Sequence, residues 1–180
     1  MVYMFLANGF EEIEALYTLD LLRRAGVEIM TVGVNDHFAC GSHGITVKCD
    51  IYKDALDTKA DFDMIILPGG MPGSTNLDSD SVVDKMISIA HATDKFICAI
   101  CAAPFILGKR GILKGKRATC FPGFENQLEG ATIVNSGCVR DGKIITGRAM
   151  GSAHEFALEI LSVLCGEQAS QKMKSAILLD

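Results

Sequence analysis

The stretch Phe96-Ile97-Cys98-Ala99-Ile100-Cys101-Ala102-Ala103-Pro104 decides the fold of this chain. Its apolar run predicts a buried strand that ends at Cys101, and a helix-like segment, 102–108, begins almost at once. Small residues stand two positions before and two positions after the cysteine, at Ala99 and Ala103. This is the layout of a nucleophile elbow, a sharp strand-to-helix turn that needs small neighbours and projects the residue at its centre.

The same alternation of strand-like and helix-like segments extends outward to both ends of the chain. Expected strands are 2–7, 27–34, 64–67, 95–100, 117–120 and 132–135, and expected helices are 11–25, 78–93, 102–108, 152–165 and 169–179. Segment 45–51 is a candidate hairpin arm, and Asp141-Gly142 is a hairpin signal between apolar arms. Buried strands alternating with amphipathic helices predict an α/β fold, with a mostly parallel sheet covered on both faces.

The composition is that of one globular domain over residues 1–180, with 49% apolar and 22% charged residues. Seventeen basic and 22 acidic residues give a net charge of −5 without a basic block, which disfavours nucleic acid and anionic membranes as partners. No apolar run approaches the roughly 20 residues of a membrane span, and the N-terminus lacks the basic start of a signal peptide. Seven cysteines, an odd number, argue against a disulfide scaffold and favour a reducing cytoplasm.

Ligand sites in such folds lie at the carboxyl ends of the strands, where Cys101 is expected. The thiol would face a helix N-terminus, whose dipole and free N–H groups favour the thiolate. Paired glycines in Pro68-Gly69-Gly70 follow another expected strand. If the N–H groups of Gly70 and Ala102 converge near Cys101, they form an oxyanion hole. The competing interpretations are a packed core cysteine and an ordinary glycine-proline loop.

A third candidate feature is the acidic start of the first expected helix, Glu11-Glu12-Ile13-Glu14. Glu11 and Glu12 fit a solvated first turn, whereas Glu14 is expected toward the strand ends. A carboxyl buried next to a thiol would shift toward its neutral form and could donate a hydrogen bond to a thiolate. It could also act as a general acid or base. The alternative is a surface charge on the helix.

The sequence predicts neither a metal nor a cofactor site. Cys98 and Cys101 form one Cys-x-x-Cys pair without a second pair, and the four histidines make no metal-binding pattern. No G-x-G-x-x-G follows the first strand, and segment 111–117 is one residue short of a phosphate-binding loop. A thioredoxin-like pair is disfavoured because Cys98 would lie inside the strand.

Four separated motifs occur together in the order known from the ThiJ/PfpI superfamily. They are Asn8-Gly9-Phe10-Glu11-Glu12-Ile13-Glu14, Leu67-Pro68-Gly69-Gly70, Ala99-Ile100-Cys101-Ala102-Ala103-Pro104 and Glu155-Phe156-Ala157-Leu158. The chain resembles the DJ-one-like branch of this superfamily over essentially its whole length. The resemblance implies a flavodoxin-like three-layer α/β sandwich, related to class I glutamine amidotransferases, and a homodimer.

The resemblance also implies roles for individual residues. Cys101 would be an easily oxidised nucleophile, Glu14 the carboxyl that hydrogen-bonds it, and Gly70 and Ala102 the sources of the backbone N–H groups. Arg148 matches an arginine near the pocket and the dimer interface.

Two positions depart from the patterns of the superfamily. The protease-like branch has histidine directly after the nucleophile, where this chain has Ala102, which weakens a peptidase function. Many DJ-one-like members have histidine where this chain has Phe121. The resemblance implies that Phe121 and Gly69, like Arg148, lie on the pocket side or the dimer side. No histidine is therefore predicted beside Cys101. The remaining candidates, His43, His91 and His154, are expected to be surface or structural residues.

These features together predict a cysteine-dependent, cofactor-independent enzyme that acts on small reactive dicarbonyls. The expected chemistry is of the glyoxalase or deglycase kind, such as methylglyoxal to lactate, in stress protection. One alternative is a redox-sensing or chaperone-like protein that uses oxidation of Cys101. A weaker alternative is an amidase or peptidase. The physiological substrate, the rate, the oxidation state of Cys101, the role of Cys98 and any protein partner stay open at this point.

Overall fold

Seven strands form the central sheet of the computed structural model, which describes residues 1–179. Along the chain they are β1 (Val2–Leu6), β2 (Ile29–Gly33), β5 (Ile51–Tyr52), β6 (Met64–Leu67), β7 (Phe96–Ile100), β10 (Cys138–Asp141) and β11 (Ile144–Gly147). Their order across the sheet is β10-β11-β7-β6-β1-β2-β5. Neighbouring strands are parallel except in the β10–β11 hairpin, which confirms the predicted mostly parallel sheet.

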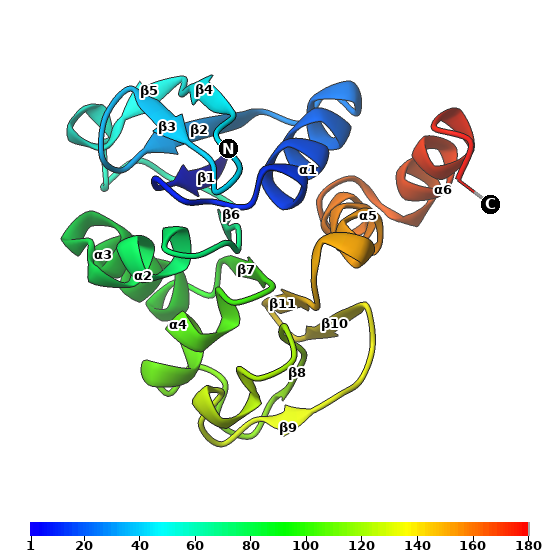
Figure 1. The fold of residues 1–180 in the computed structure, drawn as a ribbon. Coiled ribbons are helices and arrows are strands. Elements are labelled where there is room, and N and C mark those ends of the chain that lie inside the picture. The colour runs from blue at the N-terminus through cyan, green and yellow to red at the C-terminus, as the bar shows by residue number, and fades with distance from the viewer. Residues whose placement is uncertain (180) are drawn as a thin grey trace.

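Helices cover both faces of this sheet, as Figure 1 shows. They are α1 (Glu12–Arg24), α2 (Gly73–Ser79), α3 (Ser81–Ala92), α4 (Pro104–Lys109), α5 (Ala153–Cys165) and α6 (Glu167–Ala176). Alternate residues of β1 enter different cores. Phe5 belongs to the core that contains Met86 of α3, and Met4 to the core that contains Leu22 of α1 and Phe156 of α5. Burial on both faces explains why the central strands β1, β6 and β7 are apolar without interruption.

Short elements complete the fold outside the central sheet. The expected hairpin arm is present as β4 (Thr46–Lys48), which pairs antiparallel with β3 (Phe38–Cys40). The strands expected at 117–120 and 132–135 are much shorter, as β8 (Arg117–Ala118) and β9 (Thr132–Ile133). These two pair with each other in a separate small sheet. Three short 3-10 turns lie at Lys53–Ala55, Glu125–Gln127 and Met150–Ser152.

The expected single helix at 78–93 is instead two helices, α2 and α3. Asp80 separates them with an extended backbone (ψ 128°), and its carboxylate accepts hydrogen bonds from the N–H groups of Val82 and Val83 at 2.9 and 3.1 Å. This is an N-cap, which begins a new helix. Most of α2 lies before the start of the expected helix, so the prediction of one helix over 78–93 was wrong at its N-terminal end.

The sheet order brings the carboxyl ends of β11, β7, β6 and β1 next to one another. The segments that follow these strands contain Arg148, Cys101, Gly70 and Glu14 in turn. Parallel strands therefore place residues that are far apart in sequence at one edge of the sheet. Within residues 1–179, the helices are too short or too polar to cross a membrane.

Candidate active site

Cys101 occupies the sharp turn between β7 and α4. Its φ of +66° is in the left-handed region, which costs a non-glycine residue about 1–2 kcal/mol. The turn is held from both sides: the N–H of Cys101 donates to the carbonyl of Gly147 at 3.0 Å, and the N–H of Phe121 donates to the carbonyl of Cys101 at 2.8 Å. The thiol-bearing residue is partly exposed. The structure thus contains the predicted strand-to-helix elbow with a constrained cysteine at its centre.

Gly70 packs tightly against the loop between β1 and α1. Its φ is +90°, and a Cβ at this position would collide with the backbone of Gly9 and Glu11. The N–H of Glu11 donates to the carbonyl of Gly69 at 2.9 Å and joins the two loops. In this arrangement the N–H groups of Gly70 and Ala102 both act on the sulfur of Cys101. The two N–H donors that were predicted to converge near Cys101 therefore act on the same sulfur atom.

Gly69 lies between Glu14 and Cys101. Its N–H donates to Oε2 of Glu14 at 3.0 Å in a buried hydrogen bond. A Cβ on Gly69 would collide with the same carboxylate oxygen and would lie 2.5 Å from Cβ of Cys101. Only glycine allows the carboxyl of α1 to come this close to the cysteine after β7.

Glu14 is a buried carboxyl, 1% exposed, and not a surface charge. Burial raises its pKa to about 7, although hydrogen bonding from the Cys101 thiol and from the N–H groups of Gly69 and Met150 opposes the rise. Its Oε1 is buried and has no hydrogen bond of normal geometry with any described residue. A carboxyl with a pKa near 7 is half-ionised at neutral pH, as a general base requires.

The thiol of Cys101 has its pKa raised to about 12, mainly by burial and then by the negative charge of Glu14. The N–H groups of Gly70 and Ala102 lower it but do not outweigh these effects. The N–H groups therefore act in the predicted direction, toward the thiolate, while burial and the charge of Glu14 act against them. Glu14 is the group beside this thiol that can accept its proton.

The comparisons with known proteins agree with this geometry. A family model described as the DJ-1/PfpI family matches residues 1–163. This chain belongs to the DJ-1/PfpI family. It is 35% identical over 183 residues to Protein dj-1beta of Drosophila melanogaster, with 97% of this chain and 94% of the relative covered. It is 30% identical over 164 residues to Deglycase PH1704 of Pyrococcus horikoshii, with 88% and 95% covered.

A solved structure of the DJ-1/PfpI family has the same fold. The crystal structure of Drosophila melanogaster DJ-1beta superposes with a TM-score of 0.94 at 33% identity, and the alignment covers 99% of this chain and 97% of that one. The predicted flavodoxin-like sandwich, related to class I glutamine amidotransferases, is confirmed.

Three further residues near this site are Phe121, Arg148 and Met150, and each makes a different kind of interaction. Phe121 is fixed to the carbonyl of Cys101 through its backbone, and 44% of the residue is exposed. Arg148 is partly exposed, and its positive charge acts on Cys120 and lowers the pKa of that thiol, which burial otherwise raises to about 11. Met150 contributes a backbone N–H to Glu14, which sequence reasoning missed because a backbone contact leaves no trace in the side-chain pattern.

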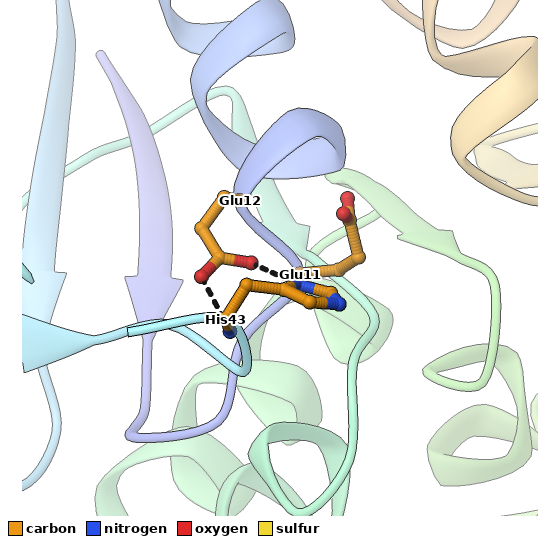
Figure 2. A group of neighbouring side chains, drawn as sticks. All are labelled: Glu11, Glu12 and His43. Atoms are coloured by element: carbon orange, nitrogen blue, oxygen red, sulfur yellow. Dashed lines mark hydrogen bonds and ion pairs between the residues drawn. The ribbon is translucent and has the colours of Figure 1, made fainter. Parts of the chain in front are cut away.

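A second cluster next to the site consists of Glu11, Glu12 and His43 (Figure 2). Glu12 was expected to be solvated, but only 3% of it is exposed. The loop from β3 to β4 folds over its carboxylate: the backbone N–H of His43 donates to Oε1 at 2.7 Å, and Nδ1 of His43 lies 2.8 Å from Oε2. Glu11 caps α1 by accepting a hydrogen bond from the N–H of Glu14 at 2.7 Å.

We call the two contacts between Glu12 and His43 the clasp, and they are electrostatic. Burial alone would raise the pKa of Glu12, but the hydrogen bonds from His43 outweigh it and lower the pKa to about 2. The hydrogen bond and negative charge of Glu12 raise the pKa of His43 in turn. Since the donors and acceptors of the clasp satisfy one another, we interpret it as a structural contact that fixes the start of α1.

Replacing His43 with alanine should lower the melting temperature more at pH 6 than at pH 9. The raised pKa of His43 means that its stabilising effect is present below its unfolded pKa of about 6.5 and is lost as pH rises through the folded value. Thermal unfolding at both pH values, with His91→Ala as an exposed control, measures the difference. An equal loss at both pH values would show that the clasp is not an ion pair.

Proposed function

We propose that this protein is a cysteine-dependent, cofactor-independent enzyme that converts small reactive dicarbonyls to 2-hydroxy acids, with methylglyoxal to lactate as the model reaction. The observation that carries the proposal is the pairing of Cys101 with Glu14, a buried carboxyl whose pKa is about 7. Two backbone N–H groups also act on this sulfur, that of Ala102 in the elbow and that of Gly70 in the loop after β6. The arrangement matches the requirements of covalent catalysis with an activated nucleophile.

In the first step the sulfur of Cys101 attacks the aldehyde carbon of the substrate. The thiol proton passes to the Glu14 carboxylate, so a free thiolate need not accumulate against its high pKa. The N–H groups of Gly70 and Ala102 hold the oxygen as negative charge develops on it. That oxygen then takes the proton back from Glu14, which gives a hemithioacetal and restores the carboxylate.

In the second step Glu14 moves a proton between the two former carbonyl carbons. The carboxylate removes the hydrogen of the sulfur-bearing carbon as a proton, which gives an enediolate, and then returns that proton to the neighbouring carbon. As the thioester forms, the hydroxyl proton on the sulfur-bearing carbon passes to the oxygen of the neighbouring carbon. Water then hydrolyses the thioester, releasing the 2-hydroxy acid and the Cys101 thiol. The sum is substrate plus one water, and the oxidation at one carbon balances the reduction at the other.

Family membership supports this proposal at a general level. The Pyrococcus horikoshii relative is named a deglycase, and deglycation likewise acts on products of reactive dicarbonyls. All seven cysteines of this chain are free thiols, which suits the reducing cytoplasm that we propose as its location. We also propose that it acts as a homodimer in stress protection.

Cys101→Ala should reduce lactate formation from methylglyoxal, measured without glutathione, to the background rate. Cys40→Ala and Cys165→Ala remove exposed cysteines and should leave the rate unchanged. Wild-type turnover that survives in Cys101→Ala would overturn the role of this residue. No turnover in any variant would overturn the enzymatic proposal.

One observation favours a redox-sensing role as the second candidate function. The unpartnered Oε1 of Glu14 belongs to a carboxyl that is largely protonated below pH 7, so it could donate a hydrogen bond to an oxygen of an oxidised Cys101. Intact-mass measurement after peroxide treatment tests this role. Retention of two oxygens on Cys101 in the wild type, with further oxidation in Glu14→Ala, would support it. A hydrolase is the weaker alternative, because Ala102 and Phe121 replace the expected histidines.

A further inference from the structure

Several exposed apolar residues adjoin the backbone of the candidate active site. The large hydrophobic residues that are at least 40% exposed in the described chain are Ile13, Phe38, Ile45, Met71, Phe121, Ile133, Met150 and Leu178. Half of this set adjoins groups that contact Cys101 or Glu14. We name Ile13, Met71, Phe121 and Met150 the apolar rim; their exposed fractions are 48%, 50%, 44% and 53%.

Each residue of the apolar rim is held by the catalytic framework itself. Phe121 donates its N–H to the carbonyl of Cys101, and the N–H of Met150 acts on the carboxyl of Glu14. Ile13 directly precedes Glu14 in α1, and Met71 directly follows Gly70. Four separate segments of the chain therefore place an exposed apolar residue beside the backbone that holds Cys101 and Glu14.

We propose that the apolar rim selects substrates, so that the site prefers 2-oxoaldehydes with an apolar or aromatic substituent over glyoxal and methylglyoxal. Phe121 is its main specificity residue, because its backbone is bonded to Cys101 and its ring is the largest group of the rim. This inference rests on the proposed function and adds the substrate class. An aldehyde bound to Cys101 leaves its substituent outside the elbow, where contact with the rim removes apolar surface from water.

The first test compares kcat/KM for phenylglyoxal and for methylglyoxal. The wild type should favour phenylglyoxal by about 10- to 100-fold, the range that apolar pockets achieve for added apolar groups. Phe121→Ser and Met71→Ser should each reduce this ratio, the first by at least about tenfold. Ile133→Ser removes an equally exposed apolar residue far from Cys101 in the sequence, on β9, and should not change the ratio. A wild-type ratio near one, or an unchanged ratio in Phe121→Ser, overturns the inference.

The second test does not require turnover. In a Cys40→Ser, Cys165→Ser background, the rates at which N-phenylmaleimide and N-methylmaleimide alkylate Cys101 are followed by mass spectrometry of the Cys101 peptide. Their ratio is divided by the same ratio for glutathione. We expect a corrected ratio of about 10 or more, falling toward one in Phe121→Ser.

These tests separate the inference from the proposed function. Absence of turnover with a high corrected alkylation ratio rejects the dicarbonyl reaction but keeps the apolar rim as a ligand-selecting element. Turnover with a corrected ratio near one rejects the rim and keeps the reaction. If Phe121→Ser changes the oligomeric mass in light scattering, the rim is instead an interface with a second copy of the chain, which also overturns the inference.

Discussion

Replacing Glu14 with glutamine should make the protein more stable at pH 8 and nearly inactive. Burial raises the pKa of this carboxyl from 4.5 to about 7. An acid whose folded pKa is raised loses stability as pH rises from its unfolded pKa to its folded pKa, because the folded state must then hold a buried charge. Glutamine keeps the shape without the charge, so Glu14→Gln should gain up to about 3 kcal/mol of unfolding free energy at pH 8.

The gain should fall to less than about 0.5 kcal/mol near pH 4.5, where Glu14 is protonated in the folded state and half-protonated in the unfolded state. Urea unfolding at pH 4.5 and pH 8 measures it. Glu12→Gln is the matched control, since Glu12 is buried two residues earlier on the same helix but has its pKa lowered to about 2. That variant should lose stability at pH 8, the opposite sign. A loss of stability in both variants would show that the folded protein does not disfavour the ionised form of Glu14.

Activity should change in the opposite direction in Glu14→Gln. The glutamine amide cannot accept the thiol proton or move a proton between the substrate carbons, so turnover should fall by about 10²- to 10⁴-fold, the range for losing a general base. The remaining activity should no longer rise through pH 7. Full activity in a stable Glu14→Gln protein would remove this residue from the mechanism.

Replacing Gly70 with alanine is expected to be the most destabilising of the single substitutions considered. A Cβ at this position would meet backbone atoms of Gly9 and Glu11, which cannot move aside as a flexible side chain can. The left-handed φ of +90° adds strain for any residue other than glycine. Together these effects should cost about 3–5 kcal/mol of unfolding free energy, the range of severe steric substitutions.

Gly26→Ala separates the two effects in this prediction. Gly26 also has a positive φ, +76°, but a Cβ there would have no heavy atom within 4 Å. It should therefore lose only about 1–2 kcal/mol, the cost of the left-handed conformation. Chemical denaturation of both variants gives the comparison. Equal losses would mean that the two loops can separate without penalty, and the packed contact at Gly70 would not be rigid.

The sequence allowed good prediction of features that depend on short segments. The elbow at Cys101 and the pairing of Gly70 with Ala102 follow from strand ends that the sheet brings together, so local patterns were sufficient. The burial of Glu14 was one of two alternatives that its position in the sequence left open, the other being a surface charge, and the structure selects burial. The roles of these residues remain proposals.

Features that depend on distant segments were not predictable. Glu12 is buried because His43, more than thirty residues away, folds over it. The thiol pKa of Cys101 depends on how burial and the Glu14 charge compare with the two N–H donors, and only the structure supplies that balance. The division of α2 from α3 required the capping geometry of Asp80, which helical periodicity alone does not reveal.

The hydrogen bonds that join the two glycine-containing loops determine what local opening of the protein involves. The N–H of Glu11 is bonded to Gly69, and the N–H of Gly73 is bonded to Gly9 at 3.1 Å, so each loop closes the other. Solvent can reach these amides only if the loops part, which also pulls Gly70 away from Cys101. Separation of Gly70 from Cys101 therefore requires the two loops at the carboxyl end of the sheet to open. Local opening and disruption of the candidate site become a single event, with one free energy.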